Sequence, residues 1–273
     1  MVTEETENPL PLKKLPPLGV IWHYTSVDVF ERILMGELAF SHYRFMNDSA
    51  EIEYGRQLLE RIEQEDSSLD KIVSDDLFKK INLFKNVYMF CLSRDGDNLY
   101  QWRSYTPKGG VAIGFCRPDL FSAIQDYMRR HKWLAHSMFD LCRCHYSEKS
   151  VRKVVSSLAH KAKNKASLCS CDKNISLYMI KVLRVWLSQK NPSFKEEQEE
   201  RFLIVEDKRD HIQIINGKPM IVLSDSRISK SISHVRLSPH GDKEHNRLLV
   251  EILREKYGLS FSIEESNSSY NGK

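Results

Sequence analysis

The segment from residue 20 to residue 40 constrains the fold more than any other part of the sequence. Its apolar first residues lead into His23-Tyr24-Thr25, and Ser26 follows as a helix N-cap whose hydroxyl can accept a backbone N–H of the first turn. Apolar side chains then recur at helical spacing, and Gly36 suits the left-handed end of a helix. The segment therefore predicts a strand, a short helix and a second strand near residue 40 in direct succession.

Apolar runs elsewhere extend this pattern into one α+β domain. Strands are predicted near residues 20, 40, 90, 112, 203 and 235. No regular β-α-β alternation runs through the chain, so the sheet should be mixed and mostly antiparallel. A basic stretch over about 148–190 predicts a helical insertion on one side of the sheet, with its lysines on a solvated face. Residues 1–17 read as a flexible lead, which leaves 18–270 as a single domain.

The composition is that of a globular protein, for which the cytoplasm is the expected location. Of 273 residues, 41% are hydrophobic and 29% are charged. The net charge of +4 is small against 41 basic and 37 acidic residues, so charge alone does not indicate a nucleic-acid partner. No apolar run is long enough to span a bilayer, and no secretion pattern precedes the domain. We therefore expect no membrane partner.

Six cysteines raise the question of a metal site. Cys91 and Cys116 lie in apolar runs and are expected to be buried thiols. Cys142-Arg143-Cys144 and Cys169-Ser170-Cys171 have a single residue between their cysteines, whereas zinc sites usually place about two to four there. We therefore expect no metal at these pairs.

Several polar and aromatic residues fall at the ends of predicted strands, where side chains can converge on a ligand. In chain order they are His23, Tyr24, Thr25, Asn47, Ser93, Trp102, Tyr105, Glu197, Glu199 and Arg201. In an extended chain the two glutamates and Arg201 would share one face. A carboxylate there can stabilise positive charge on a sugar ring or accept a hydroxyl proton. Each residue also has an ordinary structural explanation, as a packed histidine, a helix cap, a core aromatic or a solvated glutamate.

Taken in chain order, these segments resemble a bacterial family catalogued as domain of unknown function 2971. The resembling segments are His23-Tyr24-Thr25, Phe45-Met46-Asn47-Asp48 with Glu51, Cys91-Leu92-Ser93, Leu99 to Tyr105, Gly110 to Phe115, Phe194 with Glu197, Glu199 and Arg201, Ser238-Pro239, and Ser266 to Tyr270. The resemblance covers about residues 20–270, with Ser49 where the family has proline. The family name implies no activity.

A more distant resemblance to ADP-ribosyltransferases does imply one. Those enzymes carry a first-strand His-x-Thr, then a Ser and a Tyr-bearing helix, then a late Glu-x-Glu. This chain is similar, with His23-Tyr24-Thr25, Ser93 before Tyr105, and Glu197-x-Glu199 in that order. The resemblance implies an ADP-ribosyltransferase-like fold with NAD as substrate. His23 would then bind the nicotinamide ribose, Tyr105 would stack on nicotinamide, and Glu199 would hold the ribose hydroxyl and the oxocarbenium ion.

Three function classes stay open at this point. The first is an NAD-dependent transferase acting on a protein or nucleic-acid acceptor, with a role as a toxin or an anti-phage effector. The second is a non-enzymatic binding or sensor module of the same fold. The third is a nucleic-acid-binding protein that uses the basic helical insertion, for which steep salt dependence is expected. Convergence of His23, Tyr105 and Glu199 on one pocket would favour the first.

Overall fold

The computed structural model describes residues 19–46, 50–65, 86–133, 137–166, 184–206 and 210–268. Its strands are β1 (Val20–Thr25), β2 (Glu37–His42), β3 (Val87–Ser93), β4 (Val111–Cys116), β5 (Ser137–Arg143), β6 (Glu199–Glu206), β7 (Ile212–Ile215), β8 (Lys218–Ser224), β9 (Ile232–Leu237) and β10 (Ser262–Glu265). Its α-helices are α1 (Val27–Leu34), α2 (Ala50–Glu65), α4 (Leu99–Tyr105), α5 (Arg117–Arg130), α6 (Glu148–Ala166), α8 (Ser226–Lys230) and α9 (Lys243–Lys256). Two 3₁₀ turns are η1 (Tyr43–Phe45) and η5 (Pro192–Glu197).

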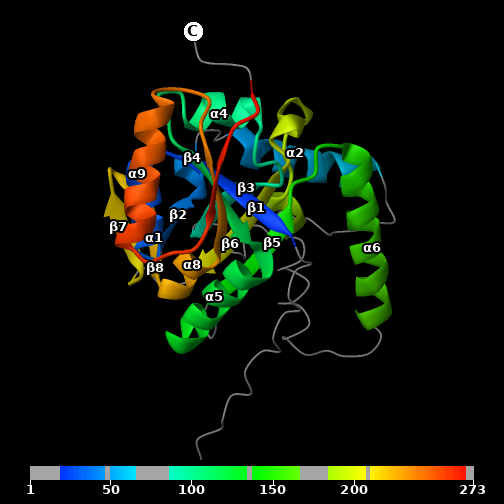
Figure 1. Cartoon of the computed structure of the whole chain (residues 1–273). Helices are drawn as coiled ribbons and strands as arrows, with labels where there is room; N and C mark the ends of the chain where they lie inside the picture. The colour runs from blue at the N-terminus through cyan, green and yellow to red at the C-terminus, as the bar shows by residue number, and fades with distance from the viewer. Residues whose placement is uncertain are drawn as a thin grey trace, which may run out of the picture.

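All these strands belong to a single sheet, whose central strands β1 and β3 lie in the middle of the molecule in Figure 1. The main path is β10-β9-β4-β1-β3-β2-β8-β7, and β6 joins β3 to β5. The pairings are antiparallel except for the parallel pair of β9 and β10. This confirms a mixed helix-and-sheet fold with a mostly antiparallel sheet. Every strand position predicted from the sequence is occupied.

The sheet forks at β3. One edge of β3 pairs with β6 from Val87 to Ser93. On the other edge, β2 pairs only with Tyr88 and Met89, and β1 pairs only with Ser93. Within the described residues, β1 and β2 thus diverge along β3 and leave 90–92 without a paired strand on that side. The side chain of His23 in β1 bonds the backbone carbonyl of Cys91 in this stretch.

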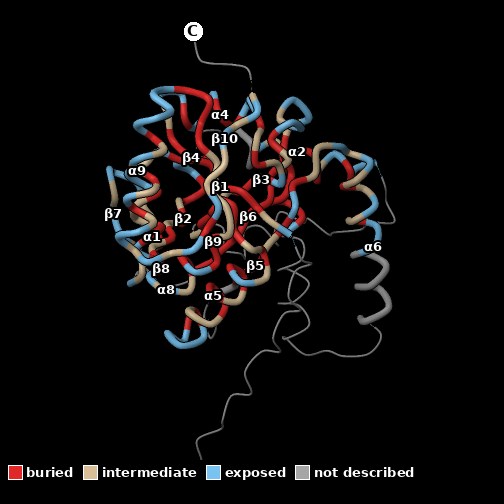
Figure 2. The backbone as a smooth tube through the Cα atoms, viewed as in Figure 1, coloured by how far each residue is buried: buried red, intermediate tan, exposed pale blue. Residues whose placement is uncertain are grey.

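Both faces of the central strands are covered by helices. Along β6, Phe202 and Ile204 join one hydrophobic core, whereas Leu203 and Val205 join a second core. This alternation follows from the period of two along a strand. Helices α1, α5, α8 and α9 contribute to the first core, and α2 and α6 contribute to the second. Figure 2 shows the resulting pattern, with buried backbone through the middle strands and exposed backbone on the outer helices.

The ends of two helices differ in how they are capped. Ser26 occupies the N-cap of α1, but its side chain makes no capping hydrogen bond, so that detail of the sequence prediction was wrong. Asn98 does cap α4, because its side chain accepts a hydrogen bond from the N–H of Gln101.

Gly36, just after α1, has a φ of +90°, and a Cβ there would lie 2.7 Å from the carbonyl oxygen of Asp225. That position therefore requires glycine.

The basic stretch that was predicted as a helical insertion over about 148–190 begins with a helix, α6 (Glu148–Ala166). Helix α6 stands at one side of the molecule beside α2, away from α9 (Figure 1), and Arg152 of α6 pairs with Glu65 of α2. The prediction of a solvated lysine face is wrong for Lys190, which is buried. Residues 167–183, within the predicted insertion, lie outside the described residues, as do residues 66–85. None of the helices in the described ranges has the length and apolar character needed to cross a membrane.

Candidate functional site

A small cavity lies where the sheet forks. It has a volume of about 50 Å³. Its walls come from β1, β3, α4 and the turn that leads into β6. The lining residues are Trp22, His23, Tyr24, Cys91, Leu92, Ser93, Gln101, Tyr105, Glu197 and Glu199. The fold therefore brings six of the ten sequence-predicted residues, namely His23, Tyr24, Ser93, Tyr105, Glu197 and Glu199, to one place.

His23 is held in its neutral form at the fork. Its Nδ1 donates a hydrogen bond to the carbonyl oxygen of Cys91 at 2.9 Å, and its ring lies 4.3 Å from the ring of Phe90, centroid to centroid. Burial lowers the pKa of His23 to about 4, and the bond to the Cys91 carbonyl opposes this only in part. Because Nδ1 carries the proton, Nε2 is the acceptor nitrogen. A neutral His23 can therefore accept a hydrogen bond from a ligand hydroxyl through Nε2.

Glu199 belongs to a buried cluster of two carboxylates and two cations. Arg201 binds both of its oxygens through one edge of the guanidinium group, with Nε 2.6 Å from Oε1 and Nη2 3.0 Å from Oε2. Lys190 binds the same Oε2 and also reaches Oε2 of Glu197. Burial alone would raise the pKa of Glu199, but Arg201 and Lys190 outweigh it and hold that pKa well below the usual range. Glu199 thus stays ionised in a cluster whose formal charges cancel.

The backbone before β6 brings the two glutamates to the same lysine. Glu197 ends the 3₁₀ turn η5, and Gln198 follows with a left-handed φ of +48°. The hydroxyl of Ser93 donates to the carbonyl of Glu197 at 2.8 Å, and the N–H of Glu199 donates to the hydroxyl of Tyr146 at 2.7 Å. Glu199 and Arg201 share a strand face as predicted, whereas Glu197 reaches the cluster from the turn.

Tyr105 forms the outer wall of the cavity. It is the last residue of α4, and 40% of its surface is exposed. Burial of the hydroxyl raises the pKa of Tyr105, and the nearby Cys91, Glu197 and Glu199 raise it further. Burial also raises the pKa of the Cys91 thiol, which contacts Glu199. Tyr105 therefore stays protonated, and Cys91 is an unreactive thiol rather than a nucleophile.

Tyr24 and Ser93 fix the loop that follows β3. The hydroxyl of Tyr24 donates to the carbonyl of Asp95 and accepts from the N–H of Asn98, each at 2.8 Å. The hydroxyl of Ser93 accepts from the N–H of Asp95 at 3.1 Å. Both side chains thus position the wall of the cavity as well as lining it.

The other predicted residues take different places. Trp102 is fully buried, packs edge-on against Tyr24, and donates from Nε1 to Asp97 at 2.8 Å, so it supports the site from behind without lining it. Thr25 is buried at the end of β1 and does not line the cavity. Arg201 acts through its ion pair with Glu199. Asn47 lies outside the described residues.

Lys190 is the functional residue that the sequence analysis missed. It was assigned to a solvated basic helix, yet only 5% of its surface is exposed. A signal was present, because Pro192 follows closely and a helix usually ends before a proline. Because Lys190 lies after the end of a helix and shortly before several glutamates, it is a candidate ion-pair partner for one of them.

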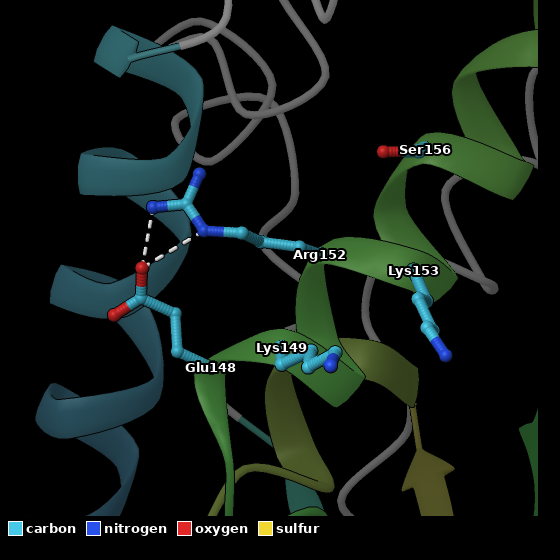
Figure 3. A pocket seen from close by; sticks show the side chains of 5 residues that line it. All are labelled: Glu148, Lys149, Arg152, Lys153 and Ser156. Carbon is cyan, nitrogen blue, oxygen red and sulfur yellow. Dashed lines mark hydrogen bonds and ion pairs between the residues drawn. The ribbon is translucent and has the colours of Figure 1, made fainter.

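The basic side of α6 is a separate surface. Glu148, Lys149, Arg152, Lys153 and Ser156 line an open hollow of about 630 Å³ (Figure 3). Arg152 turns toward Glu148, with which it pairs, whereas Lys153 points away. Two lysines are a small footprint for a phosphate backbone. The nucleic-acid interpretation therefore stays a prediction.

The cysteine pairs also stay untested as metal ligands. Cys142 and Cys144 are buried free thiols, and burial raises the pKa of Cys142 to about 12. Within the described ranges there is no group of three or more metal-binding side chains, and Cys169 and Cys171 lie outside those ranges.

Residues 101–202 match the family model described as "Protein of unknown function (DUF2971)". The matched range contains Tyr105, Lys190 and the segment from Glu197 to Arg201, which are much of the site. The match supports the resemblance to this family over those residues. No curated protein and no solved structure matches the chain.

Proposed function

We propose that the chain is an NAD-dependent ADP-ribosyltransferase whose site is the cavity at the fork. The observation that carries this proposal is the convergence of His23, Tyr105, Glu197 and Glu199 on that cavity from distant parts of the chain. In the reaction, the bond between ribose C1′ and the nicotinamide nitrogen breaks and nicotinamide leaves. An acceptor nucleophile forms the new bond to C1′ and loses its proton.

The residues suit the demands of that reaction. Neutral His23 can accept a hydrogen bond from a ribose hydroxyl, and Tyr105 offers an aromatic face at the mouth of the cavity. Positive charge develops on the ribose as nicotinamide leaves, and a fixed carboxylate stabilises it. Glu199 stays ionised under all but strongly acidic conditions, because Arg201 and Lys190 hold its pKa low.

The cavity must open before NAD can enter. Its volume of about 50 Å³ holds one or two water molecules, whereas pockets for small molecules have roughly 300–1,000 Å³. Tyr105 is the side chain best placed to move, because it is 40% exposed and its hydroxyl bonds no other described residue. The proposal therefore includes an outward rotation of Tyr105.

The test is release of nicotinamide from NAD by the purified chain, followed by chromatography. Glu199→Gln keeps the shape but removes the charge, and turnover should fall by about a hundredfold or more. Tyr105→Ala should raise the KM for NAD about tenfold through lost ring contact. The matched controls are Glu206→Gln, at the far end of β6, and Tyr100→Ala, an equally exposed tyrosine of α4.

The same assay can reject the proposal. Absence of nicotinamide release by the wild type, or unchanged turnover in Glu199→Gln, would contradict it. Circular dichroism establishes that each variant is folded. If Glu199→Gln does not fold, Tyr105→Ala decides, because an exposed residue at a helix end leaves the core intact.

One observation favours a second candidate, a non-enzymatic binding or sensor module. Both oxygens of Glu199 are already occupied by Arg201 and Lys190, and a closed cavity suits a structural ion cluster. In that case NAD would neither be cleaved nor bind, and Glu199→Gln would change stability alone.

A further inference from the structure

Three arginines surround one carboxylate at the same end of β6. The Oε1 of Glu200 lies 3.1 Å from Nη2 of Arg117, 3.5 Å from Nε of Arg143 and 4.0 Å from Nε of Arg94. Arg94 follows β3, Arg117 begins α5, and Arg143 ends β5. Three separate elements thus direct their guanidinium groups to a single point.

This cluster is distinct from the cavity at the fork. Successive side chains of a strand point to opposite faces, so Glu200 lies on the face opposite Glu199. The face of Glu200 is that of Phe202 and Ile204, and the face of Glu199 is that of Leu203 and Val205. The arginine cluster is therefore independent of the proposed NAD site.

The charges of the cluster do not balance. Three arginines face one glutamate, which leaves two positive charges in excess. Among the described carboxylates, none other forms an ion pair with Arg94, Arg117 or Arg143. Glu200 itself is only 4% exposed, whereas Arg143 and Arg94 carry the excess charge toward solution.

One guanidinium also has a buried donor without an acceptor. Arg117 is 8% exposed, and its Nε has no hydrogen-bond partner among the described residues. Nε and Nη2 form the edge with which arginine binds two oxygens of an oxyanion, as Arg201 binds Glu199. On Arg117, Glu200 occupies only the Nη2 half of that edge.

We propose that Arg94, Arg117 and Arg143 form a binding site for a phosphate group. A phosphate group brings close to two negative charges and several acceptor oxygens, which match the excess charge and the free Nε. The side chains of Arg143 and Arg94 are 56% and 34% exposed and leave the cluster open to solution on their side. Free phosphate and the phosphates of a nucleotide share this chemistry.

The test is isothermal titration of the whole chain with inorganic phosphate, pyrophosphate and ADP at constant ionic strength. We expect saturable binding of at least one of these three ligands. The ligand with the highest affinity shows whether the site binds free phosphate or the phosphates of a nucleotide. Arg143→Gln and Arg94→Gln should each weaken binding about tenfold, since each removes a charge-assisted hydrogen bond. Glu200→Gln should tighten binding several-fold, because it removes the competing carboxylate.

The control is Arg129→Gln, which removes an exposed arginine from the other end of α5 and should leave affinity unchanged. Glu199→Gln should also leave it unchanged, which separates this site from the proposed NAD site. Absence of saturable binding by the wild type would overturn the proposal. An equal loss in Arg129→Gln, or weaker binding in a folded Glu200→Gln, would do so too.

Discussion

At the residue scale, the charge of Glu199 is decided by a competition between burial and two cations. Burial favours the neutral acid, and the ion pairs with Arg201 and Lys190 favour the carboxylate. The cations prevail because Arg201 binds both oxygens and Lys190 adds a second positive charge. Because of these contacts, each buried charge of the cluster is stabilised by the other members.

Replacing Glu199 should therefore reduce stability as well as activity. Glu199→Gln leaves Arg201 and Lys190 buried without their shared carboxylate, and breaking a buried ion pair costs about 3–5 kcal/mol. Urea denaturation at pH 7 measures the change in the free energy of unfolding. The double variant Glu199→Gln/Arg201→Met should recover part of the loss. A loss below about 1 kcal/mol in the single variant would show that the cluster is not a coupled unit.

His23 should make the chain less stable in mild acid. Its pKa in the folded state is about 4, below the unfolded value near 6.5, so protons bind the unfolded state more readily. The stability from neutral His23 is present above about pH 6.5 and is lost as pH falls toward 4. At pH 4.5 the loss should be roughly 2.5 kcal/mol.

Urea denaturation at pH 7 and pH 4.5 measures this drop in the free energy of unfolding. In His23→Gln the drop should be smaller by roughly 2.5 kcal/mol. His245→Gln, at an exposed residue of α9, should show the same drop as the wild type. An equal acid loss in the wild type and in His23→Gln would mean that folding does not lower the pKa of His23.

At the scale of elements, the loop between β3 and α4 joins the cavity to the end of the chain. Tyr24 binds the loop from β1 through Asp95 and Asn98. After β10, the hydroxyl of Ser266 and the N–H of Asn267 both bind the carboxylate of Asp97. The loop that borders the cavity is thus fixed from two sides.

Gly96 should be the least replaceable residue of this loop. A Cβ there would lie 2.2 Å from the ring of Trp22, which lines the cavity, so Gly96→Ala should cost about 3 kcal/mol through overpacking. Gly217→Ala is the control, because its Cβ would meet no atom within 4 Å and only its φ of +73° costs about 1 kcal/mol. Thermal unfolding compares the two, and near-UV circular dichroism should change only in Gly96→Ala. An unchanged tryptophan signal would show that Trp22 does not pack on this loop.

Much of the element order could be predicted from the sequence, because it depends on local patterns. The strand and helix around His23 and the apolar run of β6 are encoded within a few neighbouring residues. The fork at β3 could not be predicted, because it depends on which distant strands pair with which half of β3.

Part of the candidate cavity could be predicted from polar residues in or beside short elements, whereas the buried ion pairs could not. His23 in β1, Tyr105 at the end of α4 and Glu199 at the start of β6 line the same cavity. Lys190 was missed because a basic stretch normally faces solvent, and its two carboxylate partners come from a turn that the strand pattern did not indicate. Trp102 was assigned to the ligand, but its size and apolar ring place it in the core.

At the scale of the whole molecule, one end of β6 presents two different ionic groups. Glu199 faces the fork with cations that balance it, and Glu200 faces three arginines that exceed it. The two groups lie on opposite faces because successive side chains of a strand alternate between the faces of the sheet. We propose that the closed cavity beside Glu199 opens to NAD and that His23 accepts a ribose hydroxyl.

The measurement that tests this most directly is nitrogen-15 NMR of the histidine rings during a titration with NAD at pH 7. His23 should show the neutral form protonated at Nδ1, as its bond to Cys91 requires. Its Nε2 resonance should shift saturably with NAD, and the saturation should weaken in Tyr105→Ala but not in Tyr100→Ala. A His23 Nε2 resonance that stays unchanged at high NAD concentration would contradict the account.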